Sequence, residues 1–300
     1  MKITLAQLEA FYWVVRLGSV REAARQLNVA QPTISLRIRD LETAVGSKVF
    51  QRAGRTLQAN QAGEALLVHA RGVLDEVSRI RERLGAGKEI SGILRVGVSE
   101  TFALVCLPAL LKILRTEHPL LRIELSVSTS FELEEEIRDH RLELAFLVDP
   151  VDHPGLRLVP LGIQETTWAA APAWGLGPVI RPADLRHLPI LTNAFPSPMY
   201  RRITEWFRTA GIEPTNVDIC TSVTVIVTLV TAGVALGFLP RKMIEAQHAE
   251  GLIRCLDSRP EMGDAKVFAA YRRDDTSPTI EAVMRATRTV LAQIDFLTAR

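Results

Sequence analysis

The sequence has few cysteines and lacks the spacings that build a disulfide framework or a metal site. Its 300 residues hold three cysteines, Cys106, Cys220 and Cys255, which lie far apart without a C-x-x-C pair. An odd number of widely spaced cysteines supports neither a disulfide framework nor a thiolate zinc site. The six histidines show no H-E-x-x-H or similar spacing, so we expect structural histidines and no metal or cofactor.

Motifs of the common enzyme classes are also missing. There is no G-x-S-x-G elbow, residues 85–88 lack the first glycine of a phosphate loop, and residues 175–177 lack the third glycine of a dinucleotide fingerprint. Four glutamates between Glu132 and Glu136 form an acidic run, which we interpret as the solvated face of a helix. We therefore predict that the chain is not an enzyme.

Signals for secretion and for membrane insertion are weak. Lys2 and Glu9 bracket too short an apolar run for a signal peptide, so the cytoplasm is the expected location. One uncharged stretch, from Ile219 to Pro240, reaches the roughly 20 residues of a membrane span. Threonines recur in it at helical spacing and glycines interrupt its second half, so we favour a buried helix over about 222–232 and a buried strand over 234–239.

Charge is unevenly distributed although its total is small. Lys and Arg number 36 against 34 Asp and Glu, but residues 1–60 hold nine basic and four acidic residues, a charge of +5. Residues 91–300 hold 22 and 25, a charge of −3. The length and the 47% hydrophobic content are typical of about two globular domains, and the basic head indicates a polyanion partner.

The first 45 residues show the pattern of three short helices. Capping boxes at Thr4 and Ser19 predict one helix ending near Leu17 and a second over about 20–27. Asn28 tolerates a left-handed turn, and Pro32 suits the first turn of the third helix. The buried stripe of that third helix is formed by Ile34, Ile38, Leu41 and Val45. The residues that must then point outward are Pro32, Leu36, Arg39 and Thr43, with Thr33, Ser35 and Arg37 on the flanks.

Two helices joined by a tight turn, the second basic on its outer face, form a helix-turn-helix. A small helical bundle with a solvated basic face is the alternative. Short strand-like runs over 49–52 and 56–59 flank Ala53-Gly54-Arg55 and predict a hairpin that carries Arg52 and Arg55. A basic hairpin beside a basic helix favours a winged helix-turn-helix.

A long helix follows, capped by Asn60 and starting near Gln61. Its apolar positions are spaced 4, 3, 4, 3, 4 residues apart, which is typical of a coiled-coil seam: Leu66, Ala70, Val73, Val77, Ile80 and Leu84. One amphipathic helix lying on its own domain is the alternative. From Ser91 onward strand and helix patterns alternate, among them a helix expected over 103–116 and strands over 156–161 and 189–192. This alternation predicts an α/β body of two lobes with largely parallel sheets.

The chain resembles the LysR-type transcriptional regulators. The residues that carry the resemblance in the head are Leu8, Phe11, Gly18-Ser19, Ala23-Ala24, Leu27, Gln31-Pro32-Thr33-Ile34-Ser35, Ile38, Leu41-Glu42, Gly46, Phe50, Arg52 and Ala62-Gly63. Weaker matches in the body are residues 92–97, Leu107-Pro108, His118-Pro119, residues 231–236 and Leu239-Pro240. Three positions depart from the pattern: Ala30 where a capping Ser is common, Asn60 where Thr is common, and Leu36 where Arg or Lys is frequent.

The resemblance implies a cytoplasmic regulator of transcription with three parts. These are a winged helix-turn-helix DNA-binding domain over 1–60, a linker and dimerisation helix over 61–90, and an effector-binding domain over 91–300. The last resembles periplasmic solute-binding proteins, with lobe I over 91–162 and 267–300 and lobe II over 163–266. The family further implies dimers of dimers on double-stranded operator DNA, with RNA polymerase as a further candidate partner. A solute-binding protein for transport is disfavoured by the basic head.

Candidate site residues follow for both ligands. For DNA we expect Gln31, Thr33, Ser35 and Arg37 at the major groove, with Pro32 and Leu36 beside them on the DNA-binding face. Arg39, Arg52 and Arg55 are expected at phosphates, or at the minor groove for the hairpin pair Arg52 and Arg55. For the effector we expect Ser99, Thr101 and Thr129, with Phe195 and Ser197 facing them across the cleft. Hydroxyls at strand-to-helix turns, Thr221-Ser222 among them, favour a carboxylate effector, although each one is equally explained as an ordinary helix cap.

Overall fold

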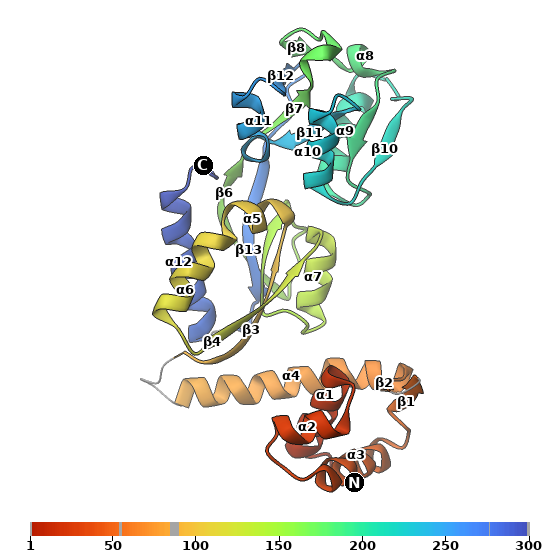
Figure 1. The fold of residues 1–300 in the computed structure, drawn as a ribbon, viewed down its shortest axis with the longest axis vertical. Coiled ribbons are helices and arrows are strands. Elements are labelled where there is room, and N and C mark those ends of the chain that lie inside the picture. Colours follow the sequence, from red (N-terminus) through yellow and green to blue (C-terminus); the bar gives the residue numbers. More distant parts are fainter. Residues whose placement is uncertain (1, 54–55, 85–89, 276, 299–300) are drawn as a thin grey trace. The chain divides into compact units, whose positions relative to one another are not determined.

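A computed structural model describes residues 2–53, 56–84, 90–275 and 277–298. The chain divides into two compact units, one reaching to Lys88 and one beginning at Glu89 (Figure 1). The first unit is helical with one hairpin, and the second contains two β-sheets with helices packed on them.

Three helices form the core of the N-terminal unit. They are α1 (Leu5–Leu17), α2 (Val20–Gln26) and α3 (Gln31–Val45). The predicted capping box at Thr4 is confirmed, because the Thr4 hydroxyl accepts from Gln7 N and the Gln7 side chain accepts from Thr4 N at 2.8 Å. Asn28 adopts the predicted left-handed conformation at φ 51°. Of the predicted inner stripe of α3, Ile34, Ile38 and Leu41 are buried in one cluster with Phe11 and Val14, and Val45 is half-buried.

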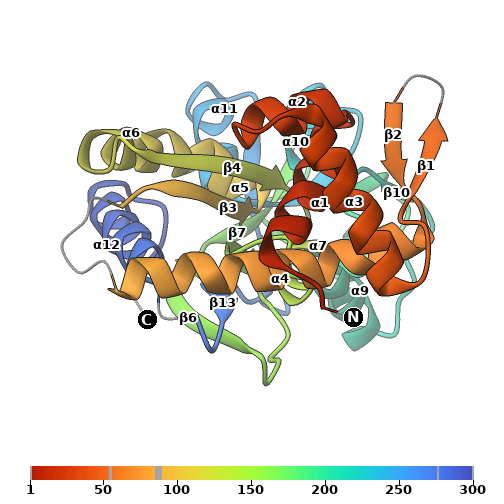
Figure 2. The ribbon, with the colours of Figure 1, turned by 90° about the horizontal axis from the view of Figure 1, so that it is seen from below.

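A hairpin follows the three helices. Strand β1 (Phe50–Ala53) pairs antiparallel with β2 (Thr56–Ala59), and Figure 2 shows the pair projecting beside α3. The ring of Phe50 lies 5.4 Å from that of Phe11, and Leu57 N donates to Gly18 O at 3.2 Å. These contacts anchor the hairpin to α1, as a winged helix-turn-helix requires. Arg52 lies on β1, and Arg55 lies outside the described residues.

Helix α4 (Gln61–Leu84) is the long helix expected from the heptad pattern. Asn60 caps it, because its Oδ1 accepts from Gly63 N at 2.9 Å. Ala70, a predicted seam residue, is instead buried against the core of the N-terminal unit together with Leu67. Val73 and Ile80 remain 43% and 47% exposed. The first turns of α4 therefore pack on their own unit, whereas Val73 and Ile80, with the half-buried Val77 between them, form an uncovered stripe on its later turns.

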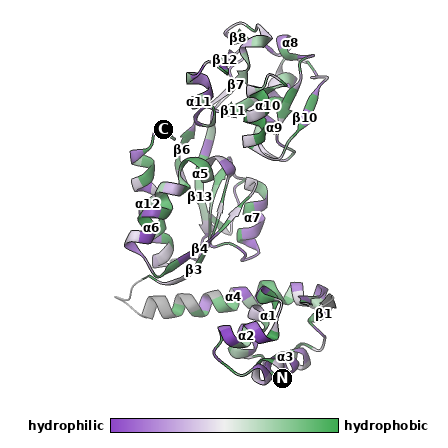
Figure 3. Ribbon diagram, in the orientation of Figure 1, coloured by the Kyte–Doolittle hydropathy of each residue, from purple (hydrophilic) through white to green (hydrophobic). Residues whose placement is uncertain are grey.

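The first sheet of the C-terminal unit has the strand order β4-β3-β5-β13-β6. Its strands are β3 (Gly92–Val98), β4 (Leu121–Val127), β5 (Leu144–Val148), β6 (Leu156–Gln164) and β13 (Ala265–Arg272). Its helices are α5 (Glu100–Val105), α6 (Leu107–Glu117), α7 (Ser130–Arg138) and α12 (Pro278–Gln293). Helix α7 is green and purple in Figure 3 because apolar residues such as Leu133 and Ile137, both buried, are interspersed with glutamates. We call this sheet with its helices lobe I.

The second sheet, with its helices, is called lobe II and has the order β10-β9-β11-β7-β12-β8. Its strands are β7 (Thr166–Ala170), β8 (Val179–Ile180), β9 (Ile190–Thr192), β10 (Val217–Ile219), β11 (Leu236–Pro240) and β12 (Arg254–Ser258). Its helices are η1 (Pro172–Trp174), α8 (Pro182–Leu185), α9 (Pro198–Thr209), α10 (Val223–Thr231), η2 (Arg241–Met243) and α11 (Glu245–Ala249). The chain crosses between the lobes twice, from β6 to β7 and from β12 to β13.

Most predicted elements of the body are present, with three differences. The sheets are mixed rather than largely parallel, because the strands at the crossings, β7 and β13, run antiparallel to their neighbours. The single helix predicted over 103–116 is split at Cys106. The short β8 and α8 were not anticipated. The uncharged stretch after Ile219 forms α10 and β11 as predicted, and no helix in the described ranges is long and apolar enough to cross a bilayer.

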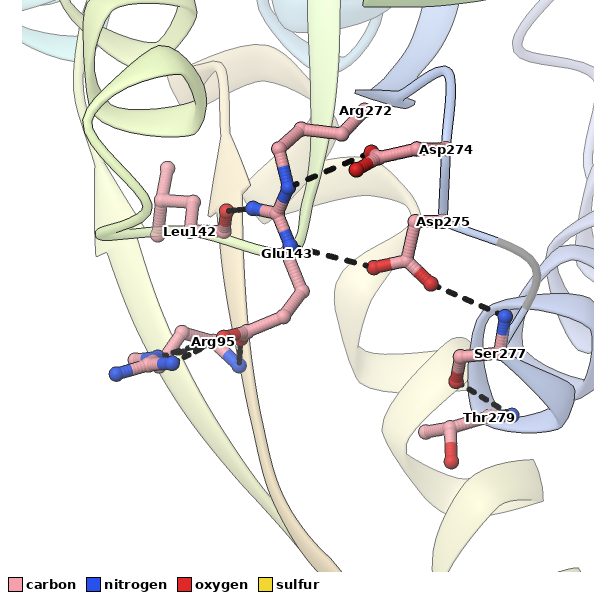
Figure 4. A network of polar contacts seen from close by, with 8 residues as sticks. All are labelled: Arg95, Leu142, Glu143, Arg272, Asp274, Asp275, Ser277 and Thr279. Carbon is pink, nitrogen blue, oxygen red and sulfur yellow. Dashed lines mark hydrogen bonds and ion pairs between the residues drawn. The ribbon is translucent and has the colours of Figure 1, made fainter. Parts of the chain in front are cut away.

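A buried polar network closes the end of lobe I where β13 leads into α12 (Figure 4). Arg272, 6% exposed, donates to Leu142 O at 3.4 Å and lies 3.5 Å from the carboxylate of Asp275. Asp275 in turn accepts from Ser277 N at 3.0 Å, and the Ser277 hydroxyl caps α12. These contacts satisfy a buried charge and fix the start of the last helix, so we assign them a structural role.

Candidate DNA-binding face and effector cavity

The outward face of α3 carries the residues predicted to meet DNA. Gln31, Pro32, Ser35, Leu36 and Arg39 are exposed, with Leu36 at 49%. Thr33 and Arg37 are half-buried on the flanks, as their position on the helix requires. The face therefore mixes amide, hydroxyl and guanidinium donors with the apolar side chains of Pro32 and Leu36, a set that can bind base edges, phosphates and a thymine methyl group.

The N-terminus of α3 has an unusual cap. Ala30 occupies the N-cap position and offers no side-chain hydrogen bond, while Thr33 N donates to Ala30 O at 3.0 Å. A Ser at this position would contribute about 1 kcal/mol to helix stability. Pro32 in the first turn lowers the number of unsatisfied N–H groups and so offsets part of that loss.

A cavity of about 450 Å³ lies between lobe I and lobe II. Lobe I contributes residues that follow the carboxyl ends of β3, β4 and β5, and lobe II contributes residues that follow β9 and β10. The carboxyl ends of strands are where α/β proteins commonly bind ligands. The volume is in the range of small-molecule sites.

Four of the five predicted effector residues line this cavity. Ser99 and Thr101 come from the start of α5, Thr129 from the start of α7, and Ser197 caps α9 by accepting from Tyr200 N at 3.1 Å. Phe195 does not line it: its ring is 71% exposed and lies 6.2 Å from the ring of Tyr200. Thr221 and Ser222, at the start of α10, also line the cavity.

Glu100 is the cavity residue that sequence reasoning missed most clearly. From lobe I its carboxylate accepts hydrogen bonds from Ser222 Oγ at 2.9 Å, Val223 N at 2.6 Å and Thr224 N at 3.1 Å, all in lobe II. Burial alone would raise the pKa of Glu100, but the hydrogen bonds from Thr224, Ser222 and Val223 together lower it. Glu100 is therefore an anion seated on the N-terminus of α10.

A second carboxylate in the lining belongs to Glu132. It accepts from the hydroxyls of Ser128 and Thr129, and Glu132 N donates to Thr129 Oγ1 at 3.3 Å. The hydrogen bond from Ser128 is the main cause that lowers the pKa of Glu132.

The acidic run from Glu132 to Glu136 was predicted to be a solvated face, and this is wrong for Glu134. That side chain is 8% exposed and accepts from Val151 N at 3.3 Å, and burial raises its pKa.

Among the described lining residues there is one guanidinium, and each of its three nitrogens donates a hydrogen bond. Arg202 of α9 lies 2.7 Å from the carboxylate of Asp149 in lobe I. Its other donors reach the carbonyl oxygens of Gly263 and, at 2.6 Å, Asp264. The Arg202–Asp149 pair is thus a second polar tie between the lobes, beside the one formed by Glu100.

Two amide side chains complete the lining. Asn193 follows β9 and donates to Cys220 O at 3.0 Å. Gln164 ends β6 and is 4% exposed, yet its Oε1 accepts no hydrogen bond from any described residue. Asn193 and Gln164 both come shortly after strands predicted from the sequence, and this position could have marked them as candidate lining residues. Within the described ranges, no group of three or more His, Cys, Asp or Glu side chains is arranged to hold a metal ion.

Both parts of the chain match known protein families. Residues 5–64 match the bacterial regulatory helix-turn-helix proteins of the lysR family, and residues 87–292 match the LysR substrate-binding domain. The second match alone spans more than half of the chain.

Named relatives and solved structures agree with this assignment. The HTH-type transcriptional regulator YusT of Bacillus subtilis (strain 168) is 30% identical over 271 residues, which are 89% of each chain. A full-length OxyR variant from Pseudomonas aeruginosa matches with a TM-score of 0.78 at 20% identity, over 99% of this chain and 97% of that one. CbnR in complex with its target DNA matches with a TM-score of 0.63 at 23% identity, over 96% and 99%. These similarities, together with the winged head and the two-lobed cavity, establish that this chain belongs to the LysR family of DNA-binding transcriptional regulators.

Proposed function

We propose that this regulator controls transcription in response to a small molecule bound in the cavity between lobe I and lobe II. The observation that carries the proposal is the cavity itself, which lies at the carboxyl ends of strands from both sheets and is lined by Ser99, Thr101, Thr129 and Ser197. A ligand that contacts both lobes binds one arrangement of them more tightly than another and so shifts their populations. Its place of action would be the cytoplasm, where it would reach DNA and RNA polymerase.

The domains would divide the work as follows. Residues 1–60 would bind DNA, residues 61–90 would join two chains, and residues 91–300 would bind the effector. The uncovered stripe of α4, with Val73 and Ile80 exposed and Val77 between them, supports a helix-to-helix contact. A dimer formed this way presents two α3 helices to the two halves of a palindromic operator, and two such dimers would form the functional tetramer.

On the DNA face we assign different tasks to neighbouring arginines. Arg37 and Gln31 would contact base edges, with Pro32, Thr33, Ser35 and Leu36 beside them in the major groove. Arg39, Arg52 and Arg55 would contact phosphates or the minor groove. Leu36 would add an apolar contact to a thymine methyl group.

Gel-shift titrations of the full chain on the DNA upstream of its own coding region test the proposal. Arg39→Ala should weaken binding to every sequence and reduce the slope of log affinity against log salt by about 0.9, the contribution of one phosphate. Arg37→Ala is the matched comparison, because it should reduce discrimination between operator and random DNA instead. Failure of the unmodified chain to bind at low salt would refute the regulatory role.

A further inference from the structure

The N-terminus of α10 is closed to an external anion. Helix N-termini bind carboxylates through free backbone N–H groups. In α10 the first two of these groups, Val223 N and Thr224 N, donate to Glu100, and Val225 N donates to Ser222 Oγ at 3.3 Å. A carboxylate effector could bind there only by displacing Glu100, which is itself an anion.

The other charges of the cavity also disfavour an anion. Among its described lining residues only Glu100, Glu132 and Arg202 carry charge. Arg202 is paired with the carboxylate of Asp149 and also donates to two carbonyl oxygens. An anionic ligand would therefore meet two carboxylates and no uncommitted cation among these residues, and repulsion between like charges grows as water is excluded.

We propose that Glu100 determines the charge of the effector: it acts as a built-in anion on α10, excludes carboxylates, and makes the cavity specific for a ligand that carries an ammonium group. The ammonium would lie in the field of Glu100 and Glu132, both of which line the cavity. This inference rests on the proposed effector cavity, and it replaces the carboxylate expected from the hydroxyl pattern with a ligand of opposite charge.

Calorimetric titrations with two four-carbon probes of opposite charge test the proposal. Succinate and 1,4-diaminobutane are titrated into the full chain and into Glu100→Ser at constant ionic strength. Removal of Glu100 frees Val223 N and Thr224 N, so succinate should bind the variant at least about tenfold more tightly than the unmodified chain. The diamine should show the reverse order. Glu117→Ser, on α6 with its side chain 59% exposed, removes the same charge outside the cavity and should change neither affinity.

Three results would overturn the proposal: succinate binding equally well to the unmodified chain and to Glu100→Ser, diamine affinity that does not respond to the substitution, or an equal effect of Glu117→Ser. Glu100→Gln serves as a second variant, since it removes the charge and keeps the shape. Operator binding by the unmodified chain is measured alongside. If the unmodified chain does not bind the operator, the regulatory role is refuted. If it binds the operator and also binds succinate as tightly as Glu100→Ser does, only the charge assignment is refuted.

Discussion

Substitution of Gly63 tests how closely the first turn of α4 packs against Val49 and Ala59 in the N-terminal unit. On helix propensity alone, Gly→Ala in a helix stabilises by about 1 kcal/mol. At Gly63 an added Cβ would lie 2.1 Å from the carbonyl oxygen of Val49 and 3.0 Å from Cβ of Ala59. The carbonyl group of Val49 cannot move away easily, because its oxygen also accepts a hydrogen bond from Asn60 N at 3.1 Å. We therefore expect Gly63→Ala to destabilise the N-terminal unit by about 2 kcal/mol, within the range of overpacked sites.

Hydrogen exchange of the full chain measures this effect. A loss of about 2 kcal/mol should speed exchange of the most protected amides in α1 and α3 roughly thirtyfold, while amides in the two sheets of the C-terminal unit serve as internal controls. Gln61→Ala, an exposed substitution in the same turn, should change exchange rates by less than about threefold. Protection in Gly63→Ala equal to or above that of the unmodified chain would show that Val49 and α4 do not approach as described.

Three further predictions concern the linker helix and two buried groups. Val77→Lys should dissociate the dimer proposed to form through α4, seen as a lower mass in sedimentation, and an unchanged mass would place the interface elsewhere. Burial raises the pKa of Glu134, so the native state binds its proton more tightly than the unfolded state and loses stability as pH rises. Glu134→Gln should therefore raise the thermal midpoint at pH 7 and lose this advantage in acid; an advantage that persists in acid would exclude the charge as its cause. Burial raises the pKa of Cys106 to about 12, so mass spectrometry should find its thiol unmodified after iodoacetamide treatment of the native chain at pH 8. Alkylation there as fast as in the unfolded chain would contradict this burial.

Local patterns in the sequence predicted the elements that depend on neighbouring residues. The box at Thr4, the left-handed Asn28 and the inner stripe of α3 are each set by residues at most 14 positions apart, so their periodicity was visible. The same holds for the hairpin and for the longer strands of the body. The resemblance to LysR-type regulators added the assignment of residues 267–300 to lobe I, which no local pattern contains.

The cavity could be predicted only in part because its chemistry depends on distant pairs. Ser99, Thr101 and Thr129 follow strands and were found from that position. Glu100 is separated from Ser222 by 122 residues, and nothing in the sequence around either one indicates their contact. Phe195 illustrates the opposite error, since its place after a strand did not determine that its ring would face solvent. Glu134 was misjudged because a run of glutamates does not show which one turns inward.

The two crossings between the lobes have a consequence for the order of folding during synthesis. Lobe II occupies one continuous stretch from Thr166 to Ser258, whereas lobe I needs β13 between β5 and β6, with α12 packed beside it. A chain emerging from the ribosome can therefore complete its DNA-binding unit and then lobe II, while lobe I waits for the last residues. Truncated or prematurely terminated copies would bind DNA without an effector site, and would compete with intact regulators for the same operator.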